Sequence, residues 1–177
     1  MKGQWKNIYS GDLALRSWWV DSVNDCKYVS ILLPEVFGIN NWIRSFSEKL
    51  AQQNVPVLAL PLYGRTAPNL DLEYSEEDLK LGRHHKNLTT LKNIIDDVSA
   101  AINWVKEKYP SKKISIIGFC FGGHAAFIAS SLKGIESSFC FYGAGVTVPR
   151  ADTNFAPIDL LEKVSGKLNF ICGSSDD

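Results

Sequence analysis

The stretch ISIIGFCFGGHA, residues 114–125, decides the fold of this chain. Four β-forming residues run from Ile114 to Ile117, a glycine-rich turn follows, and small residues after His124 start a helix. Glycines on both sides of the apex of such a turn let strand and helix approach closely, while the apex side chain stands out. The apex is Cys120, so the stretch predicts a nucleophile elbow that carries a cysteine.

Cys120 is also expected at the N-terminus of the helix that follows the turn. Unpaired N–H groups and the helix dipole favour an anion there, so we expect its thiolate to form more easily than that of a free thiol. The alternative is a small buried hydrophobic residue whose neighbouring glycines only ease helix packing. The preceding strand and the glycines on both sides favour the nucleophile.

The composition indicates one soluble globular domain that spans residues 1–177, since the chain is 45% hydrophobic and 21% charged. Nineteen basic and nineteen acidic residues balance, which argues against a nucleic acid partner and favours a small-molecule substrate. No apolar run reaches membrane-spanning length, and no signal peptide follows Met1. We therefore expect a cytoplasmic protein with no membrane partner.

The cysteine and histidine patterns predict neither disulfides nor a metal. The four cysteines show no C-x-x-C spacing, and the three histidines form no H-E-x-x-H arrangement. A phosphate or dinucleotide site is disfavoured because no G-K-[ST] occurs and bulky residues occupy the turn. We expect free thiols and no cofactor.

Short apolar runs alternate with amphipathic segments, which predicts an α/β fold with a mostly parallel sheet and helices on both faces. The first two runs, separated by Ser10, Gly11 and Asp12, predict an N-terminal β-hairpin. The expected strands cover residues 5–9, 13–20, 28–33, 55–60, 114–117, 137–142 and 167–172. The expected helices cover residues 41–54, 87–108 and 159–163, with a further helix start at 75–78 in a polar rim.

Ligands of parallel sheets bind beyond the carboxyl ends of the strands. Five residues with reactive or polar side chains lie just past predicted strand ends: Glu35, Tyr63, Cys120, Tyr142 and Asp176. The topology therefore predicts that they converge on one edge of the sheet. For Glu35 the alternative is a carboxylate that only caps the next turn.

Five motifs of the chain resemble those of the dienelactone hydrolases, a family of the α/β-hydrolase superfamily. The combination of P-E-x-F-G with G-x-C-x-G-G is more specific than either part. The resemblance implies an α/β-hydrolase fold and hydrolysis of a small ester or lactone. The motifs are LLPEVFGIN (residues 32–40), PLYGRTAP (61–68), IIGFCFGG (116–123), FYGAG (141–145) and G-x-x-D (173–176).

The resemblance also implies roles for five residues of this sequence. Cys120 is the nucleophile, Asp176 orients a histidine, and Glu35 contacts the resting thiol. The backbone N–H groups of Phe121 and Val36 hold the oxyanion.

One element of the family pattern is absent from the sequence. The family's catalytic histidine follows the aspartate, and this chain ends at Asp177, so we expect that the C-terminal part of the protein is missing. His124 is a poor substitute because helix side chains lean toward their packing face, and His84 and His85 lie in a polar stretch. The pattern around Arg83 does not match the family's carboxylate-binding residues.

Two further functions stay open at this point. A glutamine amidotransferase-like enzyme has a G-x-C-x-G-H elbow, but here Gly123 displaces His124, and the required downstream histidine and glutamate are absent. The other alternative is a non-catalytic α/β domain that binds a small ligand.

Overall fold

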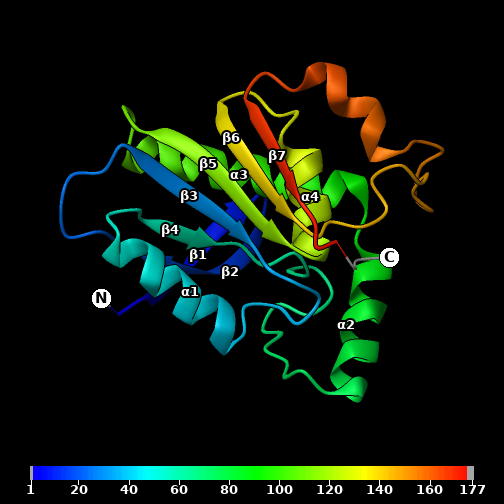
Figure 1. The fold of residues 1–177 in the computed structure, drawn as a ribbon. Helices are drawn as coiled ribbons and strands as arrows, with labels where there is room; N and C mark the ends of the chain where they lie inside the picture. The colour runs from blue at the N-terminus through cyan, green and yellow to red at the C-terminus, as the bar shows by residue number, and fades with distance from the viewer. Residues whose placement is uncertain (1, 175–177) are drawn as a thin grey trace.

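The structure is a computed structural model that describes residues 2–174 (Figure 1). Within this range the strands form one seven-stranded sheet in the order β1-β2-β4-β3-β5-β6-β7. The strands are β1 (Gln4–Ser10), β2 (Leu13–Val20), β3 (Tyr28–Leu33), β4 (Val57–Ala59), β5 (Lys113–Phe119), β6 (Ile135–Phe141) and β7 (Lys167–Ile171). The predicted α/β fold is confirmed, with strand boundaries close to those expected.

Most of the sheet is parallel. Strands β4, β3, β5, β6 and β7 run in one direction, whereas β2 pairs antiparallel with both β1 and β4. The predicted N-terminal hairpin therefore forms the edge of the sheet, with Gly11 at φ 61° in its turn. The carboxyl ends of β3, β5, β6 and β7 point toward one edge, where α2 (Glu76–Leu88) stands (Figure 1).

Helices cover both faces of the sheet. On one face α1 (Asn41–Gln52) packs Ile43 and Ala51 onto β2, β3 and β4. On the other face α3 (Leu91–Lys108) packs against β1 and β3, and α4 (Phe121–Ala129) packs against β3, β5 and β6. A 3-10 helix, η1 (Pro157–Lys163), precedes β7. Among the described helices none has the length and apolar character that crossing a membrane requires.

The polar rim expected after β4 forms a helix of its own, α2. Its N-cap is Ser75, whose hydroxyl accepts the N–H of Asp78, as the sequence predicted. The expected helix from residue 87 to 108 is divided, because Thr89 and Thr90 adopt extended backbone. The Thr90 hydroxyl then caps α3 by accepting the N–H of Asn93. The break turns α2 toward the edge where the strands end.

Gly82, in the middle of α2, allows this helix to approach the loop after β3. A Cβ at this position would lie 2.3 Å from the carbonyl oxygen of Val36. Only glycine fits so close to the backbone of another segment. The absence of a side chain thus sets the distance between α2 and Val36.

Candidate active site

Cys120 occupies the turn between β5 and α4 in the strained conformation that an elbow requires. Its φ and ψ are 54° and −117°, a region that non-glycine residues rarely adopt. Gly122 permits the turn, because a Cβ there would lie 2.1 Å from the carbonyl oxygen of Leu33 at the end of β3. The predicted strand, turn and helix are therefore confirmed, and the elbow lies directly against the first parallel strand.

Cys120 lines a pocket of about 460 Å³ at the carboxyl edge of the sheet. The pocket walls come from the loop after β3, from α2, from α4 and from the loop after β6. Val36 and Phe121, the two residues predicted to supply oxyanion donors, line the same pocket. Arg83 and Lys86 of α2 bring positive charge to it.

Glu35, Tyr74 and Tyr142, which we call the Glu35 cluster, are joined by hydrogen bonds near Cys120. The Tyr74 hydroxyl donates to Oε2 of Glu35 at 2.9 Å, and the Tyr142 hydroxyl donates to Oε1 at 3.4 Å. Both tyrosines are well exposed, with 57% and 40% of their surface accessible. The Glu35 carboxylate thus accepts hydrogen bonds from two tyrosines. It acts on the Cys120 thiol through its negative charge.

The Cys120 thiol differs from the sequence expectation of an easily formed thiolate. Burial raises the pKa of this thiol, and the negative charge of Glu35 raises it further. The N–H of Phe121 at the start of α4 and the charges of Lys86 and Arg83 lower the pKa, but they do not compensate. The sequence predicted a lowered pKa, which was wrong, because the prediction considered the helix N-terminus and left out the desolvation of the sulfur.

A second polar group, which we call the Arg150 network, lines the pocket of Cys120. It consists of His124, Arg150, Asp152 and the carbonyl group of Thr89. Arg150 donates through Nη1 to Nε2 of His124 at 2.9 Å, and through Nη2 to the Thr89 carbonyl at 2.6 Å. Its Nε donates to Asp152 at 2.8 Å. Arg150 and Asp152 lie in the loop after β6, and sequence reasoning identified neither of them.

His124 is unsuited to be the base for Cys120 in this arrangement. Its Nδ1 faces the carbonyl oxygen of Ala144 at 2.9 Å, and its Nε2 faces the guanidinium group of Arg150. Both ring nitrogens are therefore occupied. Of the other histidines, His84 is exposed, as predicted, whereas His85 is half-buried and lies beside the Thr66 hydroxyl at 3.1 Å.

The predicted convergence of strand-end residues is found for those that the structure describes. Glu35 and Tyr142 are hydrogen-bonded, and both interact electrostatically with Cys120. Tyr63 is buried, with its ring parallel to that of Phe121 at 6.0 Å between centroids. Asp176, the expected partner of the histidine, lies outside the described residues.

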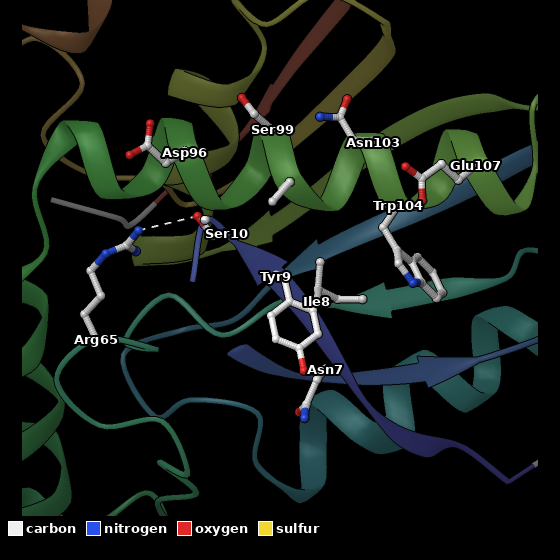
Figure 2. Close-up of a pocket in the computed structure, with 12 residues that line it drawn as sticks. Asn7, Ile8, Tyr9, Ser10, Arg65, Asp96, Ser99, Asn103, Trp104 and Glu107 are labelled. Atoms are coloured by element: carbon white, nitrogen blue, oxygen red, sulfur yellow. Dashed lines mark hydrogen bonds between the residues drawn. The ribbon is translucent and has the colours of Figure 1, made fainter. Parts of the chain in front are cut away.

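A larger hollow of about 650 Å³ lies between β1 and α3, away from the elbow (Figure 2). Its walls are mostly polar and include Tyr9, Ser10, Arg65 and Trp104. No cysteine or histidine lines it. Within residues 2–174 no three His, Cys, Asp or Glu side chains gather as a metal site requires. The smaller pocket, which contains the strained cysteine, is therefore the candidate active site.

Comparison with known protein families finds a match between residues 18–177 and the "Dienelactone hydrolase family". A Synechocystis sp. protein named "Putative carboxymethylenebutenolidase" is 31% identical over 84% of this chain and 61% of its own length. The "Carboxymethylenebutenolidase" of Pseudomonas putida is 26% identical over 67% of this chain and 51% of its own length. The chain thus spans roughly half to three fifths of these relatives.

A crystal structure from Klebsiella pneumoniae, named "Putative Dienelactone Hydrolase", has the same fold. Its TM-score to this chain is 0.75 at 16% sequence identity, and the match covers 98% of this chain and 85% of that one. At this identity the likeness concerns the fold alone.

Proposed function

The chain belongs to the dienelactone hydrolase family, and on this premise we propose that the protein hydrolyses small esters or lactones with Cys120 as its nucleophile. The observation that carries the proposal is the strained cysteine at the apex of the elbow, lining a pocket at the carboxyl edge of the sheet. Nucleophiles of α/β-hydrolases stand in this position. The family assignment leaves the amidotransferase alternative without support.

The proposed reaction has two steps. The sulfur of Cys120 attacks the carbonyl carbon of the substrate, and the ester oxygen leaves as a thioester forms. A water molecule then hydrolyses the thioester, releases the acid and regenerates the thiol. In a lactone the leaving oxygen stays attached to the acyl group, so one hydroxy acid is the product.

The oxyanion of each tetrahedral intermediate needs hydrogen-bond donors. The N–H groups of Phe121 and Val36 are the candidates, because both residues line the pocket beside Cys120. The approach of Gly122 to the end of β3 brings these two segments together. Removing one such donor costs on the order of 100-fold in rate in related chemistry.

A base must take the proton of Cys120, because burial and Glu35 favour the neutral thiol. We propose that a histidine that follows Asp176 in the complete protein accepts this proton. Asp176 orients the histidine, which later gives the proton to the leaving oxygen. Glu35 is proposed to keep the thiol protonated in the resting protein, since its charge opposes the thiolate.

The charges of the pocket favour a substrate that carries an anionic group. Arg83 and Lys86 of α2 line the pocket, whereas its other charged residues, Arg150 and Asp152, are bonded to each other. A carboxylate on the ester or lactone would therefore be attracted to the wall formed by α2.

Acylation of the full-length protein that carries this chain tests the nucleophile. After a brief reaction with 4-nitrophenyl acetate and an acid quench, mass spectrometry should find the acetyl group on Cys120, and Cys120→Ala should abolish turnover. Cys26→Ala is the matched control, because Cys26 precedes β3 at the opposite edge of the sheet. Full turnover by Cys120→Ala would contradict the proposal. Absence of turnover in the unmodified protein would favour the ligand-binding alternative.

A further inference from the structure

Arg150 joins three parts of the chain that are far apart in sequence. Its guanidinium group donates to His124 on the elbow helix, to Asp152 in its own loop and to the carbonyl of Thr89 at the end of α2. Only 11% of its side chain is exposed. Asp152 extends the connection, because it also accepts the N–H of Leu91 at the start of α3. One side chain thus connects the loop after β6, the elbow helix and the end of α2.

The chemistry of the two partners fixes the protonation state of His124. A guanidinium group has only donors, so Nε2 of His124 must accept from Arg150. A carbonyl oxygen only accepts, so Nδ1 must carry the proton and donate to Ala144. His124 is therefore neutral, with its single proton on Nδ1. A protonated imidazole would have no acceptor for Arg150 and would place a second positive charge beside it.

We propose that Arg150 is a positioning residue for the Cys120 pocket, and that it holds the loop after β6 against the elbow helix and the α2–α3 junction only while His124 is neutral. The proposal rests on the proposed function, because the pocket that Arg150 shapes is the proposed substrate site. It assigns Arg150 no contact with the reacting atoms. Loss of the Arg150 network should weaken substrate binding and leave the sulfur chemistry nearly intact.

The surroundings of His124 agree with this state. Burial lowers its pKa, and the positive charges of Arg150 and of Lys86 on α2 lower it further. The bond to Ala144 and the negative charge of Asp152 act in the opposite direction without reversing the shift. His124 is only 8% exposed, so a proton on its ring could not be solvated.

The first test separates KM from kcat in the full-length protein. Arg150→Lys keeps the charge, but one ammonium group cannot reach all three acceptors in the directions of the planar guanidinium group. We expect KM for an anionic ester to rise about tenfold, while kcat and the rate of Cys120 alkylation by iodoacetamide stay within about threefold. Arg16→Lys is the control, because Arg16 lies over the Trp5 ring in the hairpin.

The second test uses pH. Because the pKa of His124 lies below its ordinary value, its protonation should raise KM in the unmodified protein only as the pH falls below about 6.5. His124→Gln keeps an acceptor for Arg150 and cannot become charged, so this rise should be absent. His84→Gln, which changes an exposed histidine of α2, should retain the rise.

A third measurement does not depend on turnover. Hydrogen exchange of the Leu91 amide and of residues 144–156 should become at least about tenfold faster in Arg150→Lys than in Arg16→Lys. If the protein does not hydrolyse esters, the proposed function fails, but this measurement still tests the Arg150 network. Unchanged KM and unchanged exchange in Arg150→Lys would overturn the inference. An equal loss in KM, kcat and alkylation would also overturn it, because it would indicate a general loss of folded protein.

Discussion

The two polar groups beside Cys120 differ in burial and in bonding. The Glu35 cluster consists of a partly exposed carboxylate and two exposed tyrosines, and one of its hydrogen bonds is long, at 3.4 Å. The Arg150 network is largely buried, and Arg150 has three acceptors within 2.9 Å. Since buried hydrogen bonds to charged groups cost most when broken, we expect the Arg150 network to support the fold. The Glu35 cluster should instead adjust the chemistry of the sulfur.

The largest expected effect follows from removing the guanidinium group. Arg150→Met leaves Asp152, His124 and the Thr89 carbonyl without their donor, which should lower the free energy of unfolding by about 3 kcal/mol. Urea unfolding measures this loss. Arg16→Met is the control, because its cation–π contact is in the exposed hairpin, and it should cost less than about 1 kcal/mol. Equal losses would show that the Arg150 network supports the fold no more than the contact of Arg16 with Trp5 does.

The next effect concerns the pH dependence of stability. The pKa of His124 is lower in the folded protein than its ordinary value, so the unfolded chain binds the proton first. Its stabilising contribution is therefore complete above the unfolded pKa and is lost as the pH falls through the folded pKa. Breaking the bond to Arg150 should cost on the order of 2 kcal/mol. Thermal unfolding between about pH 7.5 and about pH 5 measures this loss of stability. In His124→Gln the part of the loss that comes from protonation of His124 should be absent.

A smaller effect on stability is expected for the Glu35 cluster. Glu35→Gln removes the negative charge that opposes the thiolate, so the pKa of Cys120 should fall. Alkylation of Cys120 at neutral pH should become severalfold faster, while the free energy of unfolding changes by less than about 1 kcal/mol. Site-resolved mass spectrometry separates Cys120 from the exposed Cys172. Glu77→Gln, on the exposed face of α2, should leave the alkylation rate unchanged.

The smallest effect is expected for Tyr74→Phe. The substitution removes one donor to Glu35 but keeps the ring, which packs on Phe37 with centroids 4.6 Å apart. Because the hydroxyl is exposed, water replaces the lost bond, and the free energy of unfolding should change by about 0.5 kcal/mol or less. Tyr9→Phe, in the hairpin, provides the baseline in the same urea titration. A loss as large as that of Arg150→Met would contradict the comparison.

Features encoded locally could be predicted from the sequence. The run of β-formers before Gly118 and the small residues after it predict the elbow, and the boundaries of β3 (Tyr28–Leu33) were found as expected. The convergence of Glu35 and Tyr142 on Cys120 followed from the rule that parallel strands end at one edge. Each of these inferences needs only a short pattern or the direction of a strand.

Features that depend on packing could not be predicted. The bond between Arg150 and His124 joins residues 26 positions apart, and the loop that carries Arg150 has no periodicity to place it. The sign of the Cys120 pKa shift depends on how deeply neighbouring segments bury the sulfur. The division between α2 and α3 was missed because two threonines outweighed a helical pattern. The role of Asp176 stays a prediction, since the residue lies outside the described part of the chain.

The missing side chain at Gly82 has a consequence for protein engineering. Since α2 approaches the Val36 carbonyl most closely at Gly82, this position fixes how near the helix lies to the loop after β3. Libraries that diversify positions 83, 86 and 87, which face the pocket, should yield folded variants with altered substrate preference. Any library that also randomises position 82 should lose most of its folded members, because every other residue would push α2 away from Val36.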